Sequence, residues 1–271
     1  MWCIIILSIE EASAIMKKLF LVIVAFILMF TIVGCGEEKE PNKPDDPIVD
    51  PDPHTDPDPH VDPEPEKGLT VDNLKESLQK IEKEYNDSKK ASVEVNLVNG
   101  EDTMKVVLTY ELGNDNLFKA LQYELTGEKS IAIYIKDDVV YSSANGTKSQ
   151  EALDETVNET ITNDYGLEAL LKDVTAFYAE AGLYECLTLS SSDNGVYVFD
   201  LDLVKYDTLD STHVFKTAGK DKISIIVTTV NDAITAVKVE IIEGEKTLST
   251  EVKYLGFDKD PVYPSDLDTY K

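Results

Sequence analysis

Arginine is absent from the 271-residue sequence, and only three histidines are present, so lysine supplies all the permanent positive charge. Acidic residues outnumber the lysines, and the formal net charge is −27. Because nucleic-acid phosphates and anionic lipid head groups need a basic surface, this balance argues against both as electrostatic partners. It favours a soluble, well-hydrated surface.

Cysteine is scarce as well. Cys3 and Cys35 lie near the N-terminus, and Cys186 is alone in the rest of the chain. We therefore expect no disulfide inside the folded part and a small, buried, apolar role for Cys186. A reactive thiol needs a basic neighbour that lowers its pKa. A dyad of Cys186 with His213, the one histidine of the folded part, is the only formal candidate.

The motifs that usually identify an enzyme or a metal site are missing. There is no glycine-rich phosphate loop, no His-Glu-x-x-His pattern and no calcium loop. Asp200 and Asp202 are expected on one face of a strand. Paired carboxylates can transfer protons, but on a strand they more often belong to a hydrated edge. The sequence therefore predicts a non-enzymatic protein with no catalytic residue, metal or cofactor.

An export signal lies near the N-terminus. Met16 and two lysines precede an apolar run of 15 residues from Leu19 to Val33, which is followed by Gly34 and Cys35. The run is shorter than the roughly 20 residues of a membrane-spanning helix and has the form of a signal peptide. Its end, Ile-Val-Gly-Cys, resembles the lipobox of bacterial lipoproteins, with a valine where a smaller residue is usual.

This resemblance implies that the Cys35 thiol receives a diacylglycerol and that a dedicated peptidase cuts between Gly34 and Cys35. The mature chain would then be lipid-anchored on the extracytoplasmic face of a bacterial cell membrane. Residues 1–15 do not fit, because Glu10 and Glu11 stand where basic residues are usual. We expect residues 1–15 to be a misassigned extension, Met16 to be the initiator and residues 16–34 to be the signal peptide.

Residues 35–68 are expected to be the lipidated cysteine followed by a disordered, acidic linker. Nine of the eleven prolines lie between Gly36 and Lys67. Proline at alternate positions blocks helix and sheet, and an extended polyproline II chain of this length reaches on the order of 100 Å. His54 and His60 stand among aspartates, but a flexible chain lacks the fixed geometry of a metal site. A hydrated spacer is the simpler interpretation.

Residues 69–271 predict a single α+β domain. Apolar residues at helical spacing indicate a helix over Leu69–Lys89, with Thr70 or Asp72 as its cap. The period then changes to two, and Asn99-Gly100 predicts a hairpin. The strands expected in this first series cover residues 92–97, 104–112, 117–126, 130–136 and 139–143.

Helical spacing returns in the middle of the chain. A weakly apolar helix is expected from Gln150 to about Thr162, and an amphipathic helix from Leu167 to Ala181. The strands expected after it cover residues 184–190, 196–204, 214–217, 222–230, 233–242 and 247–257. About ten or eleven strands would form one long curved antiparallel sheet, and the helices would cover its apolar face.

A lipobox, a lone N-terminal helix, a long meander and mid-chain helices together resemble the LolA/LppX-type (LppX/LprG-like) lipoprotein carriers. The resemblance covers about residues 70–260 and rests on the order of elements. It implies a half-open barrel closed by helices, with a hydrophobic cavity for acyl chains. The candidate cavity-lining residues are Met104, Val106, Leu108, Tyr110, Leu121, Tyr123, Leu170, Val174 and Phe177.

Two functions remain open at this point. The first is a monomeric, membrane-anchored carrier or sensor that binds a lipid or another apolar ligand between sheet and helices. The second is a surface-displayed protein that binds a protein, a glycan or the cell wall and has no ligand cavity. An enclosed apolar pocket favours the first, and an exposed apolar or aromatic patch favours the second.

Overall fold

The computed structural model describes residues 68–172, 180, 182–209 and 214–271. The predicted signal peptide, Cys35, the linker, and the candidates Val174, Phe177 and His213 lie outside the described residues. Within the described ranges, no helix combines the length and the apolar character needed to cross a membrane.

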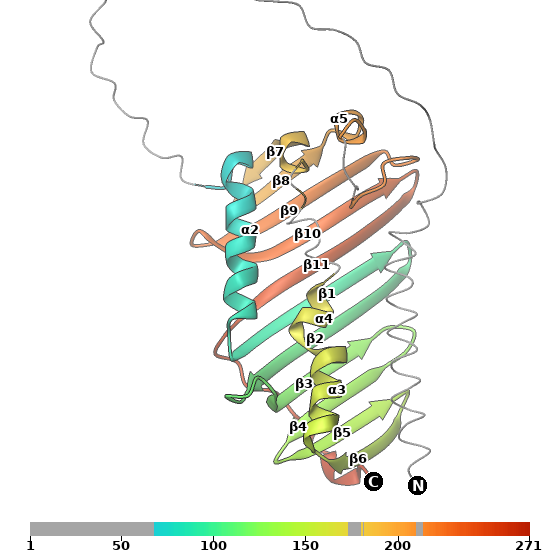
Figure 1. The fold of residues 1–271 in the computed structure, drawn as a ribbon. Helices are drawn as coiled ribbons and strands as arrows, with labels where there is room; N and C mark the ends of the chain where they lie inside the picture. Colours follow the sequence, from blue (N-terminus) through green and yellow to red (C-terminus); the bar gives the residue numbers. More distant parts are fainter. Residues whose placement is uncertain (1–67, 173–179, 181, 210–213) are drawn as a thin grey trace, which may run out of the picture.

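One antiparallel sheet of eleven strands forms the body of the domain, in the order β6-β5-β4-β3-β2-β1-β11-β10-β9-β8-β7 (Figure 1). The first meander contains β1 (Lys90–Asn99), β2 (Asp102–Leu112), β3 (Phe118–Thr126), β4 (Ile131–Lys136), β5 (Val139–Ala144) and β6 (Thr147–Ala152). The second contains β7 (Leu187–Asp193), β8 (Val196–Leu201), β9 (Lys222–Val230), β10 (Ala233–Glu243) and β11 (Lys246–Gly256). Pairing of β1 with β11 joins the two meanders, and the sheet stays open, with β6 and β7 as its edges.

One face of the sheet, which we call the inner face, carries α2 (Val71–Asn86), α3 (Glu155–Tyr165) and the five-residue α4 (Leu167–Leu171) (Figure 1). The other short elements are α5 (Leu203–Asp207), η2 (Tyr184–Cys186) and η3 (Leu267–Thr269). In Figure 1, α2 crosses the second meander while α3 and α4 lie over the first. The predicted α+β architecture, a long antiparallel sheet covered by an N-terminal helix and mid-chain helices, is therefore confirmed.

The helix predicted over Leu69–Lys89 is α2, which is shorter at both ends and is capped by Thr70, one of the two caps predicted. The Thr70 hydroxyl accepts a hydrogen bond from the Asn73 amide at 3.4 Å, and the Asn73 side chain accepts one from the Thr70 amide at 2.8 Å. This reciprocal pair satisfies two amides that the first helical turn leaves unbonded. Leu74 and Leu78 then face the sheet and are fully buried.

Several predicted segments differ from the structure, among them residues 184–186, which form η2 before β7 instead of the first part of a strand. The helix expected from Gln150 begins only at Glu155, because residues 147–152 pair with β5 as strand β6 and Asp154 caps α3 through the Val157 amide at 2.8 Å. Residues 203–207 form α5 instead of extending β8. Residues 214–217 are not a strand, since the Val214 and Phe215 amides donate to side chains and not to a neighbouring strand.

The outer face of the sheet is polar, and Glu94 is its best-connected acid. Its carboxylate is 2.6 Å from the Lys105 ammonium and 3.1 Å from that of Lys253, and it accepts a hydrogen bond from Asn96 at 3.0 Å. The hydrogen bond from Lys105, helped by those from Asn96 and Lys253, lowers the pKa of Glu94 from 4.5 to about 2. Glu94 therefore stabilises the fold above its unfolded-state pKa, and this contribution is lost as the pH falls towards 2.

Replacing Glu94 with glutamine is expected to lower the free energy of unfolding by about 1–2 kcal/mol at pH 7. The difference should vanish near pH 2, where the native carboxylate is itself becoming protonated. Urea unfolding at both pH values measures the change, and Glu245→Gln in an exposed turn is the matched control. An equal loss at both pH values would show that the ion pairs are not its cause.

Candidate ligand-binding site

The inner face of the sheet is apolar from strand to strand. Strand register places one valine from each of five neighbouring strands in a continuous row. Each of the five is at most 1% exposed. The row consists of Val106, Val95, Val252, Val237 and Val227. Such a surface is stable in water only when something covers it.

The described helices cover this face only in part. Eleven strands about 4.8 Å apart and about 27 Å long on average give it an area of roughly 1,300 Å². Helices α2, α3 and α4 have a combined length of about 48 Å and a width of about 10 Å, and so cover roughly 500 Å². The rest of the face is covered by other parts of the chain wherever its side chains are buried, and only some apolar side chains near one end of the strands stay partly exposed.

The incompletely covered area lies towards the β1–β2 and β10–β11 turns. Four apolar side chains there are only partly buried although they border the core: Leu97, Met104, Val239 and Ile241. Leu97 pairs with Met104 on β2 and with Thr250 on β11, and Thr250 pairs in turn with Val239 on β10. We call these four side chains the inner-face patch.

The structure divides the predicted cavity-lining residues into three groups. Five are packed into the core and are at most 3% exposed, which leaves no water-sized space beside most of them: Val106, Leu108, Tyr110, Leu121 and Tyr123. The Tyr123 ring lies edge-on to Tyr165 of α3, with centroids 5.1 Å apart. Met104 and Leu170 are partly buried. The other two, Val174 and Phe177, lie outside the described residues.

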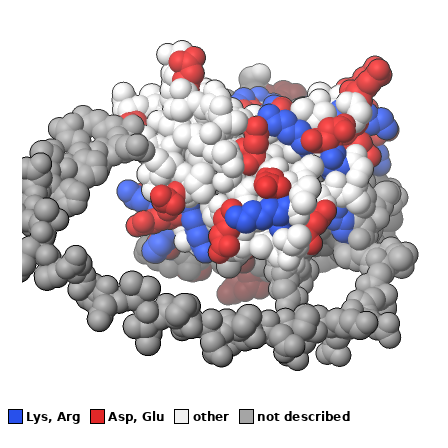
Figure 2. Space-filling model, turned by 90° about the horizontal axis from the view of Figure 1, so that it is seen from above, with Lys and Arg blue, Asp and Glu red and all other residues white. Residues whose placement is uncertain are grey.

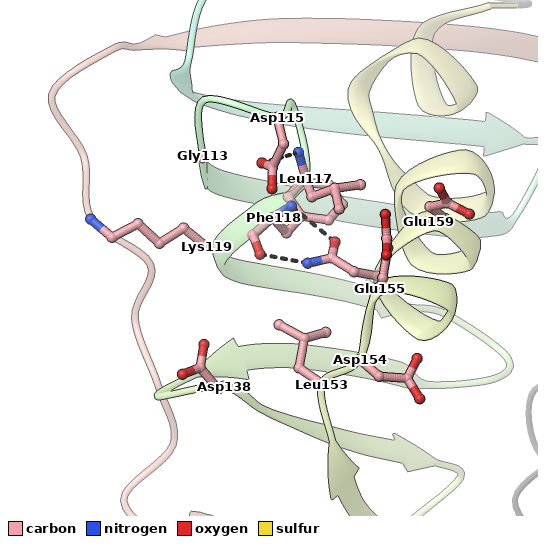
Figure 3. A pocket seen from close by; sticks show the side chains of 11 residues that line it. Gly113, Asp115, Leu117, Phe118, Lys119, Asp138, Leu153, Asp154, Glu155 and Glu159 are labelled. Carbon is pink, nitrogen blue, oxygen red and sulfur yellow. Dashed lines mark hydrogen bonds between the residues drawn. The ribbon is translucent and has the colours of Figure 1, made fainter.

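A separate pocket of about 660 Å³ opens beside the start of α3 (Figure 3). It lies between the β2–β3 loop, the β4–β5 turn and the first turns of α3. Leu117, Phe118 and Leu153 contribute apolar surface to it. The pocket is open to solvent, and so it differs from the enclosed apolar cavity that the fold resemblance implied.

Carboxylates dominate the wall of this pocket. Its lining includes Asp115, Asp138, Asp154, Glu155 and Glu159. The one cation in the lining, Lys119, is 2.7 Å from Glu111 and is thereby partly neutralised. Buried Asn158 fixes the wall by accepting from the Phe118 amide at 2.9 Å and donating to its carbonyl at 2.8 Å. The pocket would repel an anion, and nothing in it identifies a ligand.

The candidates for catalysis have structural roles. Cys186 is buried, and burial raises the pKa of its thiol, which opposes formation of a thiolate. Asp200 accepts from Ser224 at 2.8 Å. The expectation that Asp200 and Asp202 share a strand face was wrong, because β8 ends at Leu201 and Asp202 caps α5 through the Lys205 amide at 3.0 Å. Among the described residues, no group of His, Cys, Asp and Glu is placed to hold a metal ion.

Sequence reasoning missed a buried polar cluster around Glu180. Tyr206 donates to its carboxylate, with oxygen distances of 2.7 and 2.8 Å, and the Val214 amide donates to it at 3.3 Å. The Tyr206 hydroxyl in turn accepts from the Phe215 amide at 3.1 Å. These partners are 26 and 34 residues from Glu180 in the chain, so no local pattern could have revealed the cluster.

No known protein family matches the sequence, and no curated protein does. Among solved structures, lipoprotein LppX of Mycobacterium tuberculosis is similar at a TM-score of 0.35 and 11% identity, over 72% of this chain and 99% of that one. LprF from Mycobacterium bovis is similar at a TM-score of 0.34 and 12% identity, over 70% and 95%. These are proteins of the type that the sequence resembles. At such values the similarity says nothing about a ligand of this chain.

Proposed function

We propose that this chain is a non-enzymatic bacterial lipoprotein that is anchored through Cys35 on the extracytoplasmic face of the membrane. Its domain binds a lipid or another apolar ligand between the sheet and the helices, as a carrier or sensor. The observation that supports this most strongly is the continuous apolar inner face, which ends in the partly exposed inner-face patch. The acidic, proline-rich linker predicted from the sequence gives the domain reach from the anchor.

The energy available from such a site suits an acyl chain. Burial of one methylene group contributes about 0.8 kcal/mol, so a chain of about 12 methylenes contributes on the order of 10 kcal/mol before the costs of association. The inner-face patch offers apolar carbon for that contact on β2, β1 and β10, and β11 lies between the last two. A chain without arginine offers no bidentate partner for a phosphate or carboxylate head group. An uncharged head group fits best.

Introducing a charge into the inner-face patch should weaken binding. Met104→Glu is expected to reduce the affinity for Nile red, an uncharged apolar dye, at least tenfold, because a carboxylate must then be buried or exclude the ligand. Thr103→Glu is the matched control, since Thr103 is exposed and its side chain points to the outer face. Fluorescence titration measures both variants. Equal affinities would contradict a site at the patch.

The alternative, a surface-displayed interaction protein, has less support. The large apolar side chains that are exposed among the described residues are scattered over different elements and form no single patch: Val196, Val204, Val230, Phe257 and Val262. Seen from above, lysines and acids are interspersed, and no broad basic area is visible among the described residues of that face (Figure 2). A polyanionic partner is therefore not favoured.

A further inference from the structure

The last fourteen residues, 258–271, which we call the C-terminal strap, lie across the outer face of the sheet. Beyond β11 the Val262 amide donates to the side chain of Gln122 on β3 at 2.8 Å. The Tyr263 hydroxyl donates to the carbonyl of Ile135 on β4 at 2.9 Å. The strap thus bridges strands that are joined to β11 only through β1 and β2.

Two tyrosines of the strap dock on two tyrosines of the sheet. Tyr263 lies edge-on to Tyr134 of β4, with centroids 6.3 Å apart, and Tyr270 lies edge-on to Tyr141 of β5 at 5.8 Å. Tyr134 and Tyr141 are themselves paired in the sheet. Tyr270 is only 4% exposed, so the end of the chain is packed against the sheet and does not extend into solvent.

Lys148 of β6 ties the strap to the edge of the sheet. Its ammonium forms an ion pair with Asp266 and lies 4.9 Å from the centre of the Tyr270 ring. It also donates to the Thr269 hydroxyl at 3.1 Å. The backbone adds a further link, because the Gln150 amide of β6 donates to the carbonyl of Lys271 at 3.3 Å.

Apart from its pairing with β5, strand β6 makes few stabilising contacts of its own. Its sequence, TKSQEA, contains no large apolar side chain, and none of its residues is fully buried. On the inner face Ser149 only shares a hydrogen bond of 2.7 Å with Ser142 of β5. Burial raises the pKa of Glu151, helped by Asp154 nearby, so this carboxylate opposes close packing at neutral pH. An edge strand of this composition is expected to open more easily than the rest of the sheet.

The same strand carries α3. Only Leu153 and the cap residue Asp154 separate β6 from the helix. Helix α3 is fastened to β3 by the two hydrogen bonds of Asn158 with the Phe118 backbone and by the contact of Tyr165 with Tyr123. Strands β4 to β6 are therefore held between the strap outside and the helix inside.

We propose that the C-terminal strap is a latch for the ligand site. While docked, it keeps β6 and α3 closed against the inner face. Its release lets this unit open, so that a ligand reaches the inner face beneath α3, which core side chains such as Leu121 fill in the closed form. The inference rests on the proposed function, since it gives the sheet–helix interface of that function a closed and an open form.

Hydrogen exchange of the full-length chain tests the latch. In the double variant Tyr263→Ala with Tyr270→Ala, amide exchange in β6 and α3 is expected to accelerate at least tenfold, while exchange in α2 stays unchanged. The rate of Nile red association should rise as well. Val262→Ala is the matched control, because its side chain is 68% exposed and its backbone hydrogen bond is retained. Exchange that is unchanged, or accelerated equally in α2, would overturn the latch.

The two proposals fail in different ways. If Nile red binds both the wild type and the double variant, and exchange in β6 and α3 is the same in the two proteins, the latch is wrong while the proposed function stands. If exchange in β6 and α3 accelerates in the double variant but Nile red binds neither protein, the strap only holds the edge of the sheet. The proposed function and the entry route are then both overturned.

Discussion

Replacing Cys35 with serine is expected to remove the chain from the membrane lipoprotein fraction entirely. The serine hydroxyl does not replace the thiol that takes the diacylglycerol in the lipobox resemblance, and the dedicated peptidase acts beside that residue. Metabolic labelling with palmitate should therefore fall to background, and uncleaved precursor should accumulate. Intact mass spectrometry of the wild-type precursor would also show whether translation starts at Met1 or at Met16.

Two matched controls separate the anchor from general effects of losing a thiol. Cys3→Ser alters a residue upstream of the predicted start, and Cys186→Ser alters the buried thiol of the domain. Both variants should retain label and membrane location. Full labelling of the Cys35→Ser variant, or loss of label from either control, would contradict the assignment of Cys35 as the attachment site.

Replacing Leu121 with alanine is expected to lower the free energy of unfolding by about 3–5 kcal/mol, because Leu121 on β3 is fully buried on the inner face. For a domain of this size the melting temperature should fall by roughly 10 °C. Thermal unfolding followed by circular dichroism gives the value. The size of the loss also reports on function, since a side chain that lines a preformed cavity has fewer contacts to lose.

Val204→Ala is the control for an apolar truncation, because Val204 is 78% exposed and should change stability by less than about 0.5 kcal/mol. A loss below about 1 kcal/mol at Leu121 would show that this position lines empty space. It would return Leu121 to the set of cavity-lining residues. The expected large loss would instead show that Leu121 is packed in the core of the closed domain. The inner-face patch and the chain segments beside it would then supply the ligand contacts of that form.

Much of the fold was predictable because local chemistry determines it. The alternation in β9 gave the bounds Lys222–Val230, and the Asn99-Gly100 pair correctly marked the first hairpin. The turn itself is shifted by one residue, since Asn99 pairs with Asp102 and Gly100 takes the positive φ of +63°. The cap at Thr70 was predictable for the same reason, as its partner is only three residues away.

The sequence-based predictions fail where contacts between distant parts of the chain override local conformational preference. Strand β6 has no apolar alternation, and pairing with β5 and contacts with the strap hold it in place. The docking of the strap on the sheet was not predicted either, because Tyr263 and Tyr270 meet rings more than a hundred residues earlier in the chain. Sequence could place the candidate residues on one face of the sheet. It could not show which of them the helices close off.

Native mass spectrometry of the full-length chain, extracted from bacterial membranes in mild detergent, tests ligand binding most directly. The expected spectrum contains the acylated chain with one additional apolar molecule, which dissociates on activation and is reduced in the Met104→Glu variant. Thr103→Glu should retain the additional mass. A spectrum with only the acylated chain, together with no Nile red binding after delipidation, would contradict the proposal that the inner face binds an apolar ligand.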